Sequence, residues 1–309
     1  MTGPAGPIAD QAAPLRRMAA SRPGRVTTVA PAASSDWRPA RTVTVTSGKG
    51  GVGKTMVAVN LALALGELGL RVVLVDADLG MANVDVVLGM VPRYHVGHVI
   101  RGVCSLEQAL WEGPKGVLVL PGASGLAELA ALEEDRLNHL IGELRRLDRL
   151  ADVVVVDTGA GIGPQVLALL HASPEVLVVA TPEPTSITNA YGLIKTLVQE
   201  HPNGRAGVPR LLLAVNMGRT KEEGQRVVRR LQSVAGRFLG VEISMLGVVP
   251  YDRAVVATIA EQAPLLVRRP DSPAARAIRQ LARRLMDLPE EPPRRGLSGI
   301  VSRMLQRMR

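Results

Sequence analysis

Residues 48–55 read Gly48-Lys49-Gly50-Gly51-Val52-Gly53-Lys54-Thr55 and match the phosphate-binding pattern G-x-x-x-x-G-K-[ST]. The glycines let the backbone turn tightly, so that successive N–H groups can point at phosphate oxygens. Lys54 is expected to bridge the β- and γ-phosphates of ATP, and Thr55 to bind Mg²⁺. The residues of this stretch predicted to hold the nucleotide are Gly48, Gly50, Gly51, Val52, Gly53, Lys54, Thr55 and Met56.

The segments on either side of this loop, and those farther along the chain, alternate between strand-like and helix-like patterns. Alternation of this kind implies right-handed crossovers and a mostly parallel twisted sheet with helices on both faces, the α/β class of P-loop proteins. Binding sites in such sheets lie beyond the carboxyl ends of the strands. We expect strands at 42–46, 71–75, 117–120, 153–156, 176–180, 211–215 and 246–249, and helices at 54–68, 133–149, 185–199, 221–235, 252–262 and from Pro273 to Leu288.

Composition narrows the class of protein. Hydrophobic residues make up 47% of the chain but aromatic residues only 2%, so the core must consist of aliphatic side chains, as is usual in a buried parallel sheet. The single cysteine, Cys104, excludes an internal disulfide framework and a thiolate cluster. No apolar run reaches the length of about 18 residues that a transmembrane helix needs. A cytoplasmic protein is expected.

Charge and proline content divide the chain into three parts. Residues 1–40 are rich in Pro, Ala, Ser and Arg and are expected to form a flexible basic tail. Residues 41–288 are expected to form the ATPase domain, and residues 289–309 a proline-containing linker and a terminal helix. Residues 289–309 hold five arginines against two glutamates, so this end is basic and suits an anionic partner.

Carboxylates are needed beside bound Mg·ATP to hold the water shell of the metal and to orient an attacking water. Asp76 and Asp78 end the strand predicted after the loop helix, and Asp157 ends the run at 153–156. A single aspartate at a strand end is more often a helix cap, but three of them beside a phosphate loop favour a metal site. The predicted metal residues are therefore Thr55, Asp76, Asp78 and Asp157.

The loop sequence K-G-G-V-G-K-T resembles the deviant Walker A motif of the MinD/ParA superfamily of P-loop ATPases. The resemblance implies an ATP-dependent homodimer in which Lys49 reaches the phosphates bound by the other subunit. It also implies that Lys49, Lys54 and Asp78 are catalytic, with Asp78 positioning the water, and that Asp157 belongs to Walker B. By the same resemblance Asn216 binds adenine and Pro250-Tyr251-Asp252 closes over the base, although either could be a turn residue.

Near the N-terminus, Asp10-Gln11-Ala12-Ala13-Pro14-Leu15-Arg16 fits the pattern D-Q-A-x-x-L-R. This pattern is similar to the N-terminal signature of the FlhG (YlxH) family of flagellar-number regulators, which are MinD-like ATPases. The resemblance implies that Asp10, Gln11, Ala12, Leu15 and Arg16 activate a signal-recognition-type GTPase of the FlhF kind. It further implies binding to flagellar basal-body proteins of the C-ring.

The last residues have the pattern of a basic amphipathic helix, with Arg303, Arg307 and Arg309 beside an apolar stripe. Such a helix suits an anionic membrane interface, which places the ATP state of the protein peripherally on the inner face of the cell membrane. A helix packed on the domain is the alternative. The stripe follows the spacing i, i+3, i+4, i+7, i+8, i+11 and consists of Leu297, Ile300, Val301, Met304, Leu305 and Met308.

Two other functions remain open from the sequence. A ParA-like DNA-partition ATPase could use the arginines for nucleic acid, but no helix-turn-helix region is evident, so a nucleic-acid partner is not expected. A MinD-like ATPase that positions cell division shares the same loop. An iron–sulfur carrier on this fold would need at least two cysteines in each subunit, and the chain has one.

Overall fold

A computed structural model describes residues 40–78, 83–122, 146–147, 149–201 and 203–288. Residues 10–16 and 289–309 lie outside these ranges, as do most of the helix predicted at 133–149 and residues 79–82 that follow Asp78. The described strands are β1 Arg41–Ser47, β2 Val72–Ala77, β3 Trp111–Glu112, β4 Leu118–Leu120, β5 Val153–Ala160, β6 Glu175–Ala180, β7 Arg210–Gly218 and β8 Ile243–Pro250.

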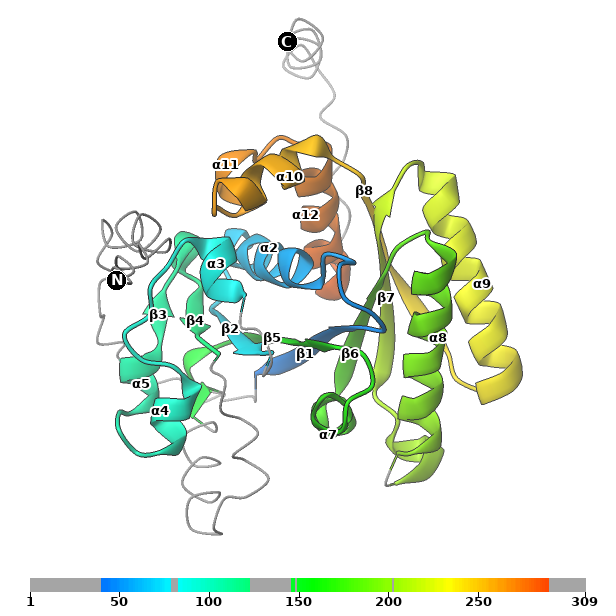
Figure 1. Ribbon diagram of the computed structural model, residues 1–309, viewed down its shortest axis with the longest axis horizontal. Coiled ribbons are helices and arrows are strands. Elements are labelled where there is room, and N and C mark those ends of the chain that lie inside the picture. Colours follow the sequence, from blue (N-terminus) through cyan, green and yellow to red (C-terminus); the bar gives the residue numbers. More distant parts are fainter. Residues whose placement is uncertain (1–39, 79–82, 123–145, 148, 202, 289–309) are drawn as a thin grey trace, which may run out of the picture.

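The strands form one twisted sheet in the order β3-β4-β2-β5-β1-β6-β7-β8 (Figure 1). Neighbouring strands are parallel except β3 and β4, which are antiparallel at one edge. The predicted mostly parallel α/β fold is therefore confirmed. Residues 111–112 were not predicted as a strand, since two residues are too few to show an alternating pattern.

Helices cover both faces of the sheet. On one face α2 and α12 pack against alternate residues of the strands, and on the other face α8 and α9 pack against the residues between them (Figure 1). The helices are α2 Lys54–Glu67, α3 Val84–Leu88, α4 Val96–Ile100, α5 Leu106–Ala109, α7 Pro164–Ala172, α8 Pro184–Gln199, α9 Lys221–Leu239, α10 Arg253–Ala260, α11 Leu265–Arg268 and α12 Pro273–Leu285, with short 3₁₀ turns at η1 Pro114–Gly116 and η3 Gly204–Gly207.

The helix predicted from residue 54 is present as α2, which begins directly after the loop and is largely buried. Eleven of the fourteen residues of α2 are buried, because the sheet, α11 and α12 all pack against this helix. The predicted helix at 252–262 is shorter in the structure and begins at Arg253, since Asp252 caps it through the backbone N–H of Ala254 at 2.9 Å. No helix in the described part of the chain is long and apolar enough to cross a membrane.

Candidate functional site

The glycine-rich loop joins the carboxyl end of β1 to the first turn of α2, as the sequence predicts. Gly51 and Gly53 both have φ of 80°, a conformation that other residues rarely adopt. A Cβ atom at Gly48 would overlap the backbone oxygen of Asn189 in α8, so this glycine is required by a close approach of two backbones. The loop is thereby held between two helices, with the N-terminus of α2 available to an anion.

The parallel register brings the two predicted strand-end carboxylates together. Asp76 of β2 is the register partner of Asp157 in β5, and both side chains are almost fully buried. The prediction that Asp157 ends its strand is wrong, because β5 continues to Ala160. It continues because it is sandwiched between β1 and β2, which supply backbone partners beyond the apolar run.

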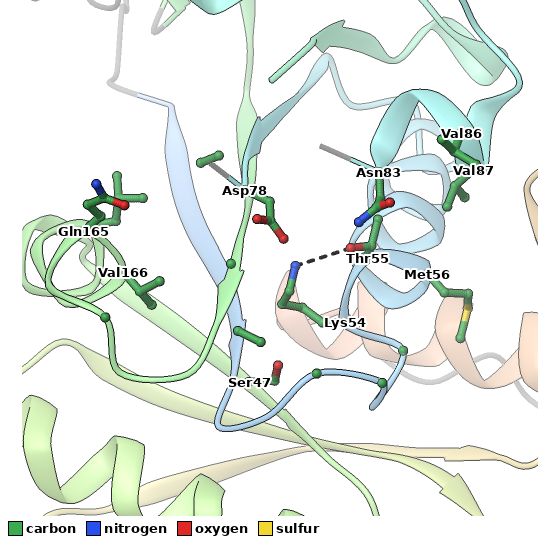
Figure 2. Close-up of a pocket in the computed structure, with 18 of the residues that line it drawn as sticks. Ser47, Lys54, Thr55, Met56, Asp78, Asn83, Val86, Val87, Gln165 and Val166 are labelled. Carbon is green, nitrogen blue, oxygen red and sulfur yellow. Dashed lines mark hydrogen bonds between the residues drawn. The ribbon is translucent and has the colours of Figure 1, made fainter. Parts of the chain in front are cut away.

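Asp157 anchors the two side chains that the loop contributes. Lys54 Nζ donates to Asp157 Oδ1 at 2.7 Å, and Thr55 Oγ1 donates to Asp157 Oδ2 at 2.7 Å. Lys54 Nζ also lies 3.3 Å from Thr55 Oγ1 (Figure 2). The ammonium, the hydroxyl and the carboxylate of Asp157 therefore form one compact cluster. Burial raises the pKa of Asp157 even though the charge of Lys54 acts in the opposite direction.

Asp76 is a second buried carboxylate beside this cluster. Burial raises the pKa of Asp76 to about 7, although its oxygens accept the backbone N–H groups of Asp78 and Val84 at 3.1 and 3.2 Å. The nearby charge of Asp157 contributes to this rise in the pKa of Asp76. Two buried carboxylates that share one lysine would be stabilised by a further cation. The structure therefore offers a fit for Mg²⁺ at this position.

A cavity of about 700 Å³ opens over the loop, and Lys54, Thr55 and Asp78 are among the residues that line it. In Figure 2 the side chain of Asp78, which follows β2, points toward those of Lys54 and Thr55 at the start of α2. The opposite wall includes Gln165 and Val166 at the start of α7. Neither was predicted as a site residue. Gly163 followed by Pro164 was the available signal, because proline favours the first position of a helix and α7 presents its first turn to the cavity.

Lys49 stands apart from the other loop residues. Its Nζ donates to Glu183 Oε2 at 2.5 Å and to Thr185 Oγ1 at 3.1 Å, at the beginning of α8. The described lining of the cavity does not include Lys49. The side chain of Glu183 is 64% exposed, so this lysine is held at the surface of the molecule. Glu183 was not predicted as its partner.

The predicted base-binding residues lie around the loop, outside the cavity lining. Asn216 is buried within β7, and its Nδ2 donates to the carbonyl of Val52 at 2.9 Å. The second oxygen of Asp252 accepts the backbone N–H of Ala274 at 3.1 Å. The two oxygens of Asp252 therefore bind backbone N–H groups in the first turns of α10 and α12. Pro250 ends β8 and Tyr251 is exposed. Their role in binding adenine stays a prediction.

Magnesium ordinarily keeps several waters and takes one or two carboxylates together with phosphate oxygens. Among the described residues, no three His, Cys, Asp or Glu side chains are gathered into a complete metal site. Thr55, Asp157 and Asp76 would thus supply part of a coordination shell, directly or through water. Asp78 is half-buried on the cavity wall, where it can orient a water.

The fold and the site together define a P-loop nucleotide-binding protein. A family model described as the CobQ/CobB/MinD/ParA nucleotide binding domain matches residues 43–265. The chain belongs to this family and is a P-loop ATPase of the MinD/ParA type. ATP and Mg²⁺ fit the family.

Several known proteins resemble the chain over most of its length. Antiactivator FleN of Pseudomonas aeruginosa is 42% identical over 269 residues, which cover 87% of this chain and 94% of FleN. Flagellum site-determining protein YlxH of Helicobacter pylori is 33% identical and covers 85% of this chain and 89% of its own. The structure of septum site-determining protein MinD from Pyrococcus horikoshii, complexed with Mg-ADP, superposes with a TM-score of 0.63 at 28% identity, over 80% of this chain and 96% of that one.

Proposed function

We propose that the chain is an ATP-dependent dimerising switch that regulates the number or placement of flagella. The relatives that support this are FleN, an antiactivator, and YlxH, a flagellum site-determining protein. The dimer is proposed from the position of Lys49. This loop lysine lies outside the lining of the nucleotide cavity of its own subunit and beside the exposed Glu183. A lysine placed there can serve the phosphates of a second subunit.

Within one subunit the roles follow from the geometry of the cavity. Lys54, which is paired with Asp157 in this structure, would contact the β- and γ-phosphates of bound ATP. Thr55 and Asp157 would hold Mg²⁺ and its waters. When bound, Mg²⁺ supplies positive charge that offsets the charge developing on the phosphates. Asp78 orients the water that attacks the γ-phosphate. The buried carboxylate of Asp76 would be stabilised by a cation bound nearby.

Light scattering tests the dimer. With ATP and the Asp78→Ala background, the protein should be dimeric, and with ADP it should be monomeric. Lys49→Ala should abolish the dimer while retaining part of the nucleotide affinity, whereas Lys221→Ala, a control at an exposed lysine of α9, should behave like the parent. A Lys49→Ala dimer as strong as that of the parent would refute the role in trans.

Hydrolysis and binding separate the roles of Asp78 and Lys54. Asp78→Ala should bind ATP normally and lose most turnover, by about 10²-fold or more, because positioning of the water is lost. Lys54→Ala should lose tight binding as well, since it also leaves Asp157 buried without its ion-pair partner. Normal turnover in Asp78→Ala would mean that another group orients the water.

The finer parts of the proposal concern residues outside the described ranges. Asp10, Gln11, Ala12, Leu15 and Arg16 are proposed to activate an FlhF-type GTPase. A peptide of residues 1–25 should accelerate GTP hydrolysis by that GTPase, and Gln11→Ala and Arg16→Ala should each weaken the effect. Binding to C-ring proteins belongs to the same proposal.

Membrane association is proposed for the stripe from Leu297 to Met308. The ATP dimer would carry two copies of the segment, and avidity can then strengthen binding by roughly 10²–10⁴-fold. Val301→Glu should lower sedimentation with anionic vesicles in ATP and leave dimerisation intact. A chain truncated after Pro293 that still sediments would show that the segment is not the anchor.

Cell-division positioning or DNA partition remains the second candidate function, supported by the fold shared with MinD.

A further inference from the structure

Helix α9 lies at the periphery of the molecule (Figure 1), and its exposed residues include a row of arginines. Arg226, Arg229, Arg230 and Arg237 are all exposed, and their spacing places them on one side of the helix. At about 1.5 Å per residue the row is roughly 16 Å long. The other side of α9 packs against the sheet through Val227 and Leu231, among other apolar residues. These four residues, Arg226, Arg229, Arg230 and Arg237, form the α9 arginine row.

Most of this charge is not compensated by neighbouring acids. The acidic residues of α9 are Glu222 and Glu223, both in its first turn, where the helix dipole favours them. Glu223 accepts the backbone N–H of Arg219 at 2.7 Å, and Glu222 lies close to Arg226. Within the described ranges no carboxylate forms an ion pair with Arg229, Arg230 or Arg237.

An exposed aromatic ring lies at the C-terminal end of the row. Phe238 is the only phenylalanine of the chain, yet its side chain is 64% exposed. The guanidinium of Arg237 lies 5.3 Å from the centre of its ring. Arg205 adds another guanidinium close to Gly240, the cap of the helix. A shallow hollow of about 380 Å³ at this end of the helix is lined by Gln232, Gly236, Gly240, Val241, Glu242 and Ile243.

The end of the described chain lies near the same strand. The chain passes from Phe238 into β8 within five residues. From the opposite face of the sheet, α12 packs on β8, where Arg284 Nη1 donates to the carbonyl of Leu246 at 3.0 Å. The amphipathic stripe predicted at 297–308 follows α12 after a short linker. Its eight residues, 289–296, can span at most about 28 Å. The linker therefore limits the start of the stripe to within about 28 Å of the end of α12.

We propose that the α9 arginine row and Phe238 form a second contact with an anionic lipid surface, beside the terminal stripe. The inference rests on the proposed membrane association. Lipid head groups supply the negative charge that the arginines lack, and the interfacial layer accepts the ring of Phe238. A duplex nucleic acid would satisfy the charge but would offer no apolar layer to the ring. The occupant is thus a membrane containing anionic phospholipid.

Vesicle sedimentation of the full chain with ATP tests this proposal. Vesicles of phosphatidylcholine with phosphatidylglycerol are compared with phosphatidylcholine alone. Arg229→Ala combined with Arg230→Ala should lower the partition constant on anionic vesicles on the order of tenfold, and Phe238→Ser several-fold. The matched control is Arg93→Ala with Arg101→Ala, two exposed arginines near the opposite edge of the sheet, which should bind like the parent.

The outcomes separate this inference from the proposal on which it rests. Thermal unfolding and light scattering should show that each variant remains folded and dimerises with ATP. If truncation after Pro293 abolishes sedimentation while the α9 variants bind like the parent, only the α9 contact is refuted. If the truncated chain binds like the parent, the terminal stripe is not the anchor, and loss in the α9 variants would then still support the contact. Equal loss of vesicle binding in the control pair also overturns the inference. Retention of the same variants on immobilised duplex DNA is measured alongside, and a loss there without a loss of vesicle binding would overturn it as well.

Discussion

Substitution of Asn60 tests how the loop helix is fixed to the rest of the domain. Asn60 lies in the middle of α2 with no exposed surface, among apolar residues. Its Nδ2 donates to the carbonyl of Met56 at 2.8 Å, and its Oδ1 accepts the backbone N–H of Leu266 in α11 at 3.0 Å. A buried amide in such surroundings must be hydrogen-bonded, so this side chain ties α2 to the segment that follows α10.

Several contributions set the size of the effect of Asn60→Ala. The N–H of Leu266 loses its acceptor in the core, which costs about 1–3 kcal/mol. The space vacated by the amide adds about 1 kcal/mol, and the better helix propensity of alanine returns about 0.5 kcal/mol. The free energy of unfolding should therefore fall by about 1.5–3.5 kcal/mol. For a domain of this size, Tm should fall by roughly 3–14 °C.

Urea unfolding of the nucleotide-free protein measures this loss. Asn189→Ala, which truncates an exposed asparagine of α8, is the matched control and should stay within about 0.5 kcal/mol of the parent. Asn60→Leu restores much of the volume but not the acceptor, so it should remain destabilised by about 1–3 kcal/mol. If Asn60→Ala and Asn60→Leu both unfold at the urea midpoint of the parent, the hydrogen bond to Leu266 does not hold the two helices together.

Two further predictions concern the last residue of α2, Glu67, and the loop that precedes this helix. Burial raises the pKa of Glu67, but the hydrogen bond and charge of Arg279, 2.6 Å away, lower it overall. Glu67→Gln should therefore reduce the free energy of unfolding by about 1 kcal/mol at neutral pH. This difference from the parent should disappear as the pH falls through the lowered pKa of Glu67. Urea unfolding over a pH series measures it. Gly48→Ala should destabilise the protein by about 1–3 kcal/mol, because its Cβ would overlap the backbone of Asn189, whereas Gly50→Ala meets no atom within 4 Å and should be far milder. Equal effects of these two substitutions on Tm would refute the steric argument.

The sheet was predictable because its strands are continuous aliphatic runs between turn signals. The sequence predicted that Asp76 and Asp157 belong to one metal site, and the pairing of β2 with β5 places these two residues side by side. The short helices α3, α4, α5 and α11 have four or five residues each, too few to show a period of 3.6. The extension of β5 through Asp157-Thr158-Gly159-Ala160 carried no strand signal, because pairing on both sides and not residue propensity produces it.

Contacts between distant segments account for the part of the site that the sequence did not reveal. Glu183 is 134 residues from Lys49, and only the order β5-β1-β6 brings the start of α8 beside the loop. Asn216 reaches Val52 across 164 residues by the same route, through β7. The resemblance of motifs predicted which residues form the site, but the hydrogen-bond partners of those residues depend on the order of the strands.

The cis contact of Lys49 bears on its proposed role in a dimer. In one subunit its ammonium already has partners in Glu183 and Thr185, so reaching another subunit means exchanging one set of contacts for another. Lys49 and Glu183 are both partly exposed, and exposed ion pairs contribute only about 0–1 kcal/mol. Contacts of an ammonium with phosphate oxygens in a site closed to water are considerably stronger. The cis contact can thus keep Lys49 ordered at the surface without opposing dimerisation, and the exposed Glu183 would remain at the interface after the lysine has moved.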